Sequence, residues 1–267
     1  MIKPVKLLMT AIVCLAPLLS AGAEVDLFDM QAALLLGETT VKVPAEAQEA
    51  DLAAIRDCIK GAKGITLDLS ATKITELGGV FKNCTALKAV ILPSTLTSIG
   101  AWAFSGCDSL TSITIPTSVT SIGERAFSGC DKLAKIDVAK GSKNYASVDG
   151  VLFSKDKTTL VCFPAGKSGE YYEVPGGTVT IGDSAFYECT GLKVVKLPSG
   201  VKSIGDSAFS HCENLSLIKI PESVTSTGSS AFSGCTSLTS VTFAHTGEAV
   251  REVSRNWKLL PYIALIR

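Results

Sequence analysis

The sequence predicts a mainly β solenoid with short helical turns, made of stacked 23-residue coils. Phenylalanine recurs at 23-residue intervals in two runs of three copies, and a cysteine follows each copy by three residues. A leucine and then a β-branched residue follow at two further steps of three. Four registers that keep phase over six copies indicate an internal repeat. The repeated pairs are Phe81 and Cys84, Phe104 and Cys107, Phe127 and Cys130, Phe186 and Cys189, Phe209 and Cys212, and Phe232 and Cys235.

Residues 1–23 have the features of an export signal. Lys3 and Lys6 give a positive start, Leu7 to Leu19 is a short apolar run, and small residues occupy positions 21–23. The run is shorter than the ~20 residues that span a bilayer, although an uncleaved anchor is the alternative. We therefore expect an exported protein that is secreted, periplasmic or on the cell surface.

Residues 24–64 do not fit the repeat and are expected to form an N-terminal helical cap that shields the first coil. The segment from Pro44 to Lys60 is rich in residues that favour helices. Within it, Leu52, Ile55 and Ile59 recur at helical spacing and should share one buried face. The first coil then begins with the predicted strand at Ile65.

The repeats fall into two blocks, residues 65–138 and 175–243. In the unit that ends at Phe127, the alternating stretch Ile113–Ile115 predicts a short strand. Pro116 ends that strand because proline cannot donate to a β ladder. A second short extended piece follows, and the Ala-Phe pair at the end of the unit predicts a single helical or 3₁₀ turn. One coil cannot bury its own apolar face, but stacked coils can.

Between the blocks, the 59 residues from Phe127 to Phe186 exceed one repeat by 36. The extra residues lie in 139–174, where two apolar β-rich runs flank a polar turn at 154–157. This pattern predicts a β-hairpin that bulges from the solenoid. Asp149 and Gly150 predict a turn, because the spaced carboxylates of a calcium loop are missing. Residues 244–267 break the pattern and form a tail or partial cap.

The unit "LTSITIPTSVTSIGERAFSGC" resembles the BspA-like leucine-rich repeats, also called the Treponema pallidum type. The resemblance covers about residues 65–243, with departures at Val80, Thr178 and Thr227. The phrase that begins at Asn144 and runs to Phe153 also resembles an insert of that family. The resemblance implies a leucine-rich-repeat solenoid and an association with adhesion of bacteria to host proteins or to other microbes.

The cysteines are expected to be small buried hydrophobic residues. Equivalent cysteines of adjacent coils would be ~4.8 Å apart, within the range of a disulfide, but stacked side chains point in parallel rather than toward each other. A spacing of 23 produces a row and not the convergent ligand set that zinc requires. His211 beside Cys212 occupies a variable position. We therefore expect no catalytic, cofactor-binding or metal-binding residues and no enzyme activity.

The balanced charge, 25 Lys and Arg against 25 Asp and Glu, argues against nucleic acid or an anionic membrane as the main partner. Membrane association would need an anchor that the sequence does not show. The candidate surface is the outward row of the strands, which includes Ile91 and Asp137 and is mildly basic overall. Its expected partner-binding residues are Lys88, Thr114, Lys135, Lys193, Lys196, Lys219 and Thr242. Lysines on this row could instead simply keep the sheet soluble.

The sequence thus predicts a secreted or cell-surface protein-binding module, adhesin-like, whose protein ligand is a host matrix or microbial surface protein. The alternative is a structural envelope module without a host ligand.

Overall fold

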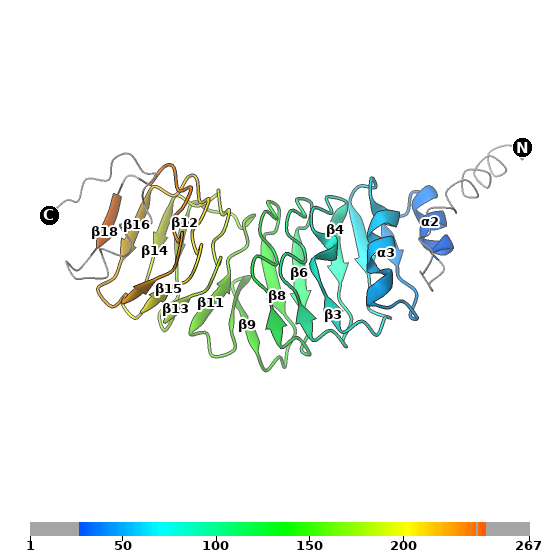
Figure 1. Cartoon of the computed structure of the whole chain (residues 1–267), viewed down its shortest axis with the longest axis horizontal. Coiled ribbons are helices and arrows are strands. Elements are labelled where there is room, and N and C mark those ends of the chain that lie inside the picture. Colours follow the sequence, from blue (N-terminus) through cyan, green and yellow to red (C-terminus); the bar gives the residue numbers. More distant parts are fainter. Residues whose placement is uncertain (1–26, 239, 244–267) are drawn as a thin grey trace, which may run out of the picture.

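The computed structural model describes residues 27–238 and 240–243, so the expected signal 1–23 and tail 244–267 lie outside the described residues. The described chain is an elongated stack of coils with two short helices at its N-terminal end (Figure 1). Within these residues no helix is both long and apolar enough to cross a membrane.

The N-terminal cap is helical, as predicted, and it also contributes a strand. Leu52, Ile55 and Ile59 are buried on one side of a helix. The strand of the cap pairs in parallel with the first strand of the repeats, so it begins the sheet that the repeats continue. In chain order the elements are α2 (Phe28–Leu35), β1 (Thr40–Lys42), the 3₁₀ helix Glu49–Asp51 and α3 (Leu52–Ile59).

Each coil contributes a longer strand and most coils a shorter one, and equivalent strands pair in parallel. The longer strands form one sheet in each block. These are β2 (Ile65–Asp68), β4 (Leu87–Ile91), β6 (Ser112–Ile115) and β8 (Lys135–Val138), then β12 (Tyr171–Glu173), β14 (Val194–Lys196), β16 (Leu217–Ile220) and β18 (Ser240–Phe243). The shorter strands are β3 (Glu76–Leu77), β5 (Ser98–Ile99), β7 (Ser121–Ile122), β13 (Thr180–Ile181), β15 (Ser203–Ile204) and β17 (Ser226–Thr227).

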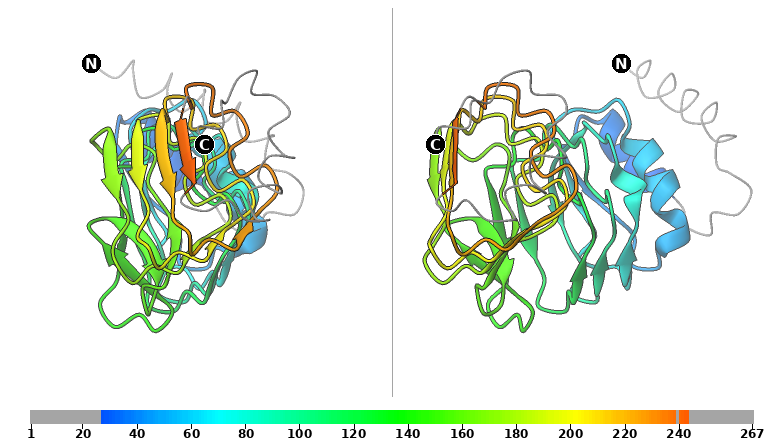
Figure 2. Two further views of the ribbon diagram at one scale, coloured as in Figure 1. Left: turned by 90° about the vertical axis from the view of Figure 1, so that its left-hand side faces the viewer. Right: turned by 60° about the vertical axis from the view of Figure 1, so that its left-hand side comes forward.

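Seen along the axis, the longer strands lie on one side of the coil and turns lie on the other (Figure 2). The Ala-Phe pairs belong to turn segments. We call the outward side of the longer strands the strand face and the opposite side the turn face. In the first copy the turn is the 3₁₀ helix Gly79–Phe81.

The phenylalanines stack in two columns in the core. In the first block the ring centroids of Phe81, Phe104 and Phe127 are 5.8 Å apart at each step. In the second block the steps are 5.2 Å from Phe163 to Phe186, 4.7 Å to Phe209 and 5.2 Å to Phe232. These centroid distances of 4.7–5.8 Å are close to the ~4.8 Å spacing of paired strands, which confirms the stacked-coil prediction.

The insert forms the predicted hairpin, but the hairpin does not bulge from the solenoid. The strands β9 (Tyr145–Val148), β10 (Val151–Ser154) and β11 (Thr159–Cys162) are antiparallel neighbours. β10 is buried on both sides, with Leu152 in the core of the first block and Val151 and Phe153 in the core of the second. The hairpin is therefore a wall between two hydrophobic cores.

The C-terminal part of the expected insert joins the second block. β12 pairs with β14, β11 pairs with β13, and Phe163 stacks on Phe186. This pairing favours a start of the second block near Phe163 and not at 175. The repeat pattern does not reveal this coil, because Gly166 stands where the other copies have cysteine. A Cβ there would lie 2.5 Å from the carbonyl carbon of Lys132, so glycine lets the two blocks touch.

Candidate functional site

The strand face carries the residues predicted to bind a partner, divided between the two sheets. Lys196 pairs in register with Lys219, which pairs with Thr242. Thr114 is exposed beside Asp137 in the first sheet. Lys88, Lys135 and Lys193 are exposed at the beginning of their strands or just before them.

Ion pairs make this row less basic than its sequence suggests. The Nζ atoms of three lysines lie 2.6–2.7 Å from carboxylate oxygens, in the pairs Lys135–Asp137, Lys193–Glu170 and Lys196–Glu173. The hydrogen bond from Lys196 lowers the pKa of Glu173 and raises that of the lysine. Exposed pairs of this kind contribute little to the stability of a fold, because solvent screens the two charges. Lys88 and Lys219 make no ion pair with any other described residue.

Exposed apolar side chains also lie on the strand face. Ile91 lies on the outward row, as the strand alternation predicts, whereas the exposure of Tyr171 and Leu217 was not predicted. Tyr171, Val194 and Leu217 are register partners on adjacent strands. Tyr171 is 54% exposed and Leu217 is 41% exposed, while Ile91 in the first sheet is 46% exposed. Tyr171 was missed because its strand was assigned to the insert. Leu217 was missed because it precedes the inward residue Ile218.

The repeat cysteines are buried, and five of them donate a hydrogen bond. The Sγ of each lies 2.9–3.6 Å from the carbonyl oxygen of the phenylalanine one coil earlier, 26 residues back in the chain. Burial raises the pKa of the Cys130 thiol to about 12. These thiols thus fill the core and pair carbonyl groups, and among the described residues no cluster of three potential metal ligands occurs.

On the turn face, adjacent coils are joined by a ladder of backbone hydrogen bonds. The N–H groups of Trp102, Phe104 and Gly106 donate to carbonyl oxygens of the next coil at 3.1, 2.8 and 2.8 Å. In the second block, the N–H groups of Ser184, Phe186 and Glu188 make the equivalent bonds. Each turn therefore presents donors toward the C-terminal end of the stack and acceptors toward the N-terminal end.

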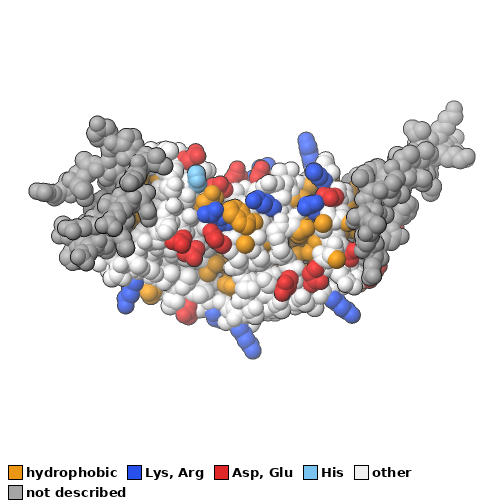
Figure 3. Space-filling view, in the orientation of Figure 1, with side chains coloured by type: hydrophobic (Ala, Val, Ile, Leu, Met, Phe, Trp, Pro, Cys, Tyr) orange, Lys and Arg blue, Asp and Glu red, His pale blue; other side chains and the backbone are white. Residues whose placement is uncertain are grey.

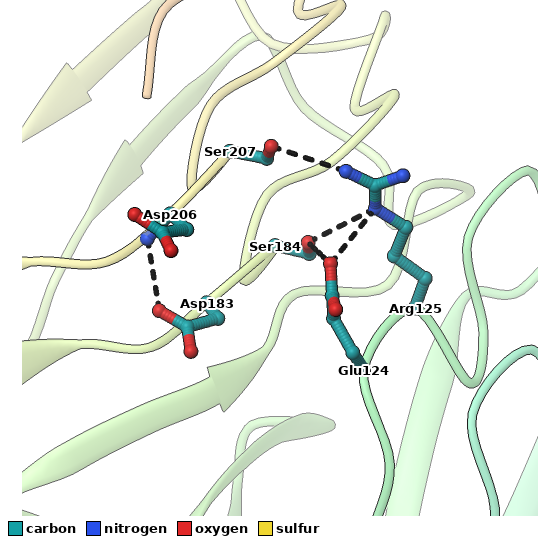
Figure 4. Close-up of polar contacts among 6 residues, drawn as sticks. All are labelled: Glu124, Arg125, Asp183, Ser184, Asp206 and Ser207. Atoms are coloured by element: carbon teal, nitrogen blue, oxygen red, sulfur yellow. Dashed lines mark hydrogen bonds and ion pairs between the residues drawn. The ribbon is translucent and has the colours of Figure 1, made fainter. Parts of the chain in front are cut away.

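Arg125 joins the two blocks across the turn face (Figure 4). Its Nε atom lies 3.2 Å from Oε1 of Glu124 and 3.3 Å from Oγ of Ser184, and its Nη2 atom lies 3.1 Å from Oγ of Ser207. No sequence pattern predicts these contacts, because the two serines are 59 and 82 residues away in the chain.

The Arg125 guanidinium also belongs to a row of cations and aromatic rings. Its Cζ atom lies 4.9 Å from the ring centroid of Trp102 and 4.5 Å from that of Tyr187. At one end of the row, the Nζ atom of Lys82 lies 4.5 Å from the ring centroid of Trp102. At the other end, the rings of Tyr187 and His211 pack edge to face. Figure 3 shows hydrophobic side chains beside Lys or Arg near the middle of this face.

A cleft of about 240 Å³ lies at the block junction beneath this row. One wall comes from the turn of Arg125 and Phe127, and the other from Val161, Cys162 and Ala165. The two blocks are in contact where the Gly166 N–H donates to the carbonyl oxygen of Leu133, 2.9 Å away. The cleft lies between that contact and the side chain of Arg125.

Parallel strands stacked at a 23-residue repeat, with a buried leucine and a buried cysteine in six of the coils, define a leucine-rich-repeat solenoid. The chain belongs to the BspA-type leucine-rich-repeat family, whose sequence model matches residues 56–167 and 160–254 in six copies. No curated protein sequence matches the chain significantly.

Solved structures that share the fold include the two that follow. A leucine-rich repeat protein from Eubacterium ventriosum is 25% identical with a TM-score of 0.62, covering 84% of this chain and 63% of its own. The pneumococcal vaccine antigen PcpA is 25% identical with a TM-score of 0.58, covering 77% of this chain and 62% of its own. This chain therefore corresponds to less than two thirds of the length of either protein.

Proposed function

We propose that this protein is an exported protein-binding module whose partner docks on the strand face of the second block. The observation that carries the proposal is the exposed apolar pair Tyr171 and Leu217, with Val194 between them in register. Buried aromatic and aliphatic anchors supply most of the affinity of protein interfaces. Lys219, which lies one row away without an ion pair to a described residue, adds a positive charge at the border of this patch.

The partner class is a protein of the host extracellular matrix or of another microbial surface, as the family resemblance implies. PcpA is named a vaccine antigen, and this supports an exported location for the present chain. The predicted residues Lys88, Thr114, Lys135, Lys193, Lys196 and Thr242 would form the polar border of the surface. Polar borders of this kind contribute more to association rate and specificity than to affinity.

The test measures binding of the purified protein to immobilised extracellular-matrix proteins and to surface extracts of other bacteria. The double variant Tyr171→Ala and Leu217→Ala should lose at least about tenfold in affinity, because anchor truncations cost about 2 kcal/mol or more. The triple variant Lys193→Glu, Lys196→Glu and Lys219→Glu should slow association most at low salt.

The control is a charge-matched triple variant at Lys140, Lys155 and Lys157, which are exposed away from the strand face of the second block. Binding by the wild type that neither strand-face variant alters would remove this surface from the proposal. Resistance of the protein to protease applied to whole cells, with no binding in any assay, would favour the structural envelope module.

A further inference from the structure

The hydrogen-bond ladder of the turn face stops at the block junction. By the repeat, the N–H groups of Arg125, Phe127 and Gly129 should donate to the next coil, as those of Trp102, Phe104 and Gly106 do. The hairpin takes the place of that coil, and within the described residues these three N–H groups have no hydrogen-bond acceptor. Buried backbone donors rarely remain unpaired in folded proteins.

Two of these donors belong to the wall of the junction cleft. Arg125 and Phe127 both line it, whereas Gly129 lies outside it under the carboxylate of Glu188. A Cβ on Gly129 would be 3.0 Å from Oε2 of that glutamate, so the third donor is covered. The cleft therefore offers two backbone donors that are two residues apart. In the second block, the carbonyl groups that accept the equivalent bonds are also two residues apart and belong to the turn at 206–210.

The charges and side chains of the cleft decide between possible occupants. Its lining carries one cation, Arg125, and two carboxylates, Glu124 and Asp183. This balance does not favour a free anion. An uncharged amide backbone supplies carbonyl acceptors without that repulsion, and the opposite wall, with Val161 and Ala165, accepts small apolar side chains.

We propose that the junction cleft binds a short peptide segment of a partner protein in a turn conformation, which completes the broken ladder. Two carbonyl groups of that segment accept hydrogen bonds from the N–H groups of Arg125 and Phe127. The segment acts as the turn of the coil that the hairpin displaces, and main-chain hydrogen bonds hold it in place. This site is on the turn face and is separate from the strand-face surface.

The probe is the capped peptide acetyl-Asn-Ser-Ala-Ala-Ser-amide. It follows the turn at 206–210, whose carbonyl groups at Asp206 and Ala208 accept the equivalent bonds in the second block, and asparagine replaces Asp206 so that the peptide is uncharged. Alanine replaces the phenylalanine because the cleft has a volume of only about 240 Å³. Two hydrogen bonds give weak binding, so the peptide is titrated to about 10 mM.

Occupancy is measured by alkylation of Cys162, a half-buried thiol in the cleft wall. Cys58 is half-buried in α3 and serves as the internal control. Burial raises the pKa of both thiols, so labelling with a maleimide is followed over hours by peptide mapping. At about twice the Kd, the peptide should slow Cys162 labelling about threefold and leave Cys58 unchanged.

A second peptide, in which an alkene replaces the amide after the first alanine, lacks one of the two acceptors and should protect much less. Equal protection by both peptides, or no protection of Cys162 by the first, would overturn the proposal. The variant Ala165→Leu, which narrows the cleft, should abolish protection. The strand-face double variant Tyr171→Ala and Leu217→Ala should keep it, so failure at one surface is distinguishable from failure at the other.

Discussion

Replacing Arg125 with alanine removes the side chain that connects the two blocks on the turn face. The side chain is 23% exposed and contacts two aromatic rings at 4.9 and 4.5 Å. Each such contact stabilises a partly buried site by about 1 kcal/mol. The hydrogen bonds to Ser184 and Ser207 add up to about 1 kcal/mol each, and the ion pair with exposed Glu124 adds about 0–1 kcal/mol. Because these terms are not additive, we expect a loss of about 2–4 kcal/mol.

Urea unfolding followed by circular dichroism measures this loss, with Arg125→Lys and Lys82→Ala as controls. Lysine keeps the charge but not the planar donor group, so it should recover only part of the stability. Lys82 makes a single exposed ring contact, so its removal should cost about 0.5–1 kcal/mol. Because the two blocks have separate cores, Arg125→Ala should also lower the cooperativity of unfolding. A loss below about 1 kcal/mol with an unchanged slope against urea would refute the assigned role.

Three further variants test the core and the junction. Phe209→Ala should cost about 3–5 kcal/mol in thermal melts, since the ring is fully buried between Phe186 and Phe232, and a loss near zero would contradict the stacked column. Cys212→Ala should cost about 1–2 kcal/mol, because it removes the hydrogen bond from Sγ to the Phe186 carbonyl and leaves a small cavity; unchanged stability would show that the thiol is only filler. Burial raises the pKa of the Glu188 carboxyl in the folded protein. The stability that the protonated carboxyl contributes to the fold is therefore fully present below the unfolded-state pKa, and it is lost as pH rises through the folded-state pKa. Glu188→Gln should therefore raise the melting temperature at pH 7 relative to wild type but not at pH 3, and a lower melting temperature at pH 7 would contradict this sign.

The repeat registers were sufficient to predict the coils, because every copy buries the same residue types in the same positions. They could not identify the coil that begins at Phe163, since it has glycine in place of cysteine and Tyr171–Glu173 in place of the usual strand. The wall formed by β10 was missed for another reason. Val151, Leu152 and Phe153 are consecutive apolar residues, which is the pattern of a strand buried on both sides, and not that of a hairpin exposed on one.

The candidate surfaces could also be predicted only in part from the sequence. Strand alternation predicted that Lys196 and Lys219 would point outward, and both are exposed. The neutralising partner of Lys196 is Glu173, which lies in a strand that the repeat pattern did not reveal. The contacts of Arg125 depend on how the insert places the second block against the first. Local patterns carry no information about that placement.

One structural feature, the hairpin wall, accounts for both proposed surfaces. An uninterrupted solenoid would pair every turn donor with the next coil and would continue one sheet along its whole strand face. The wall ends the first sheet at β8 and leaves Tyr171 exposed on β12, the first strand of the second. On the opposite face it separates the turn of Arg125 from the following coil, and the arginine side chain bridges the gap while two backbone donors stay open. A chain in which the hairpin is replaced by one regular 23-residue coil should therefore be more stable than the wild type and lose peptide protection of the junction. Retained protection in that chain would show that the broken ladder is not the peptide site.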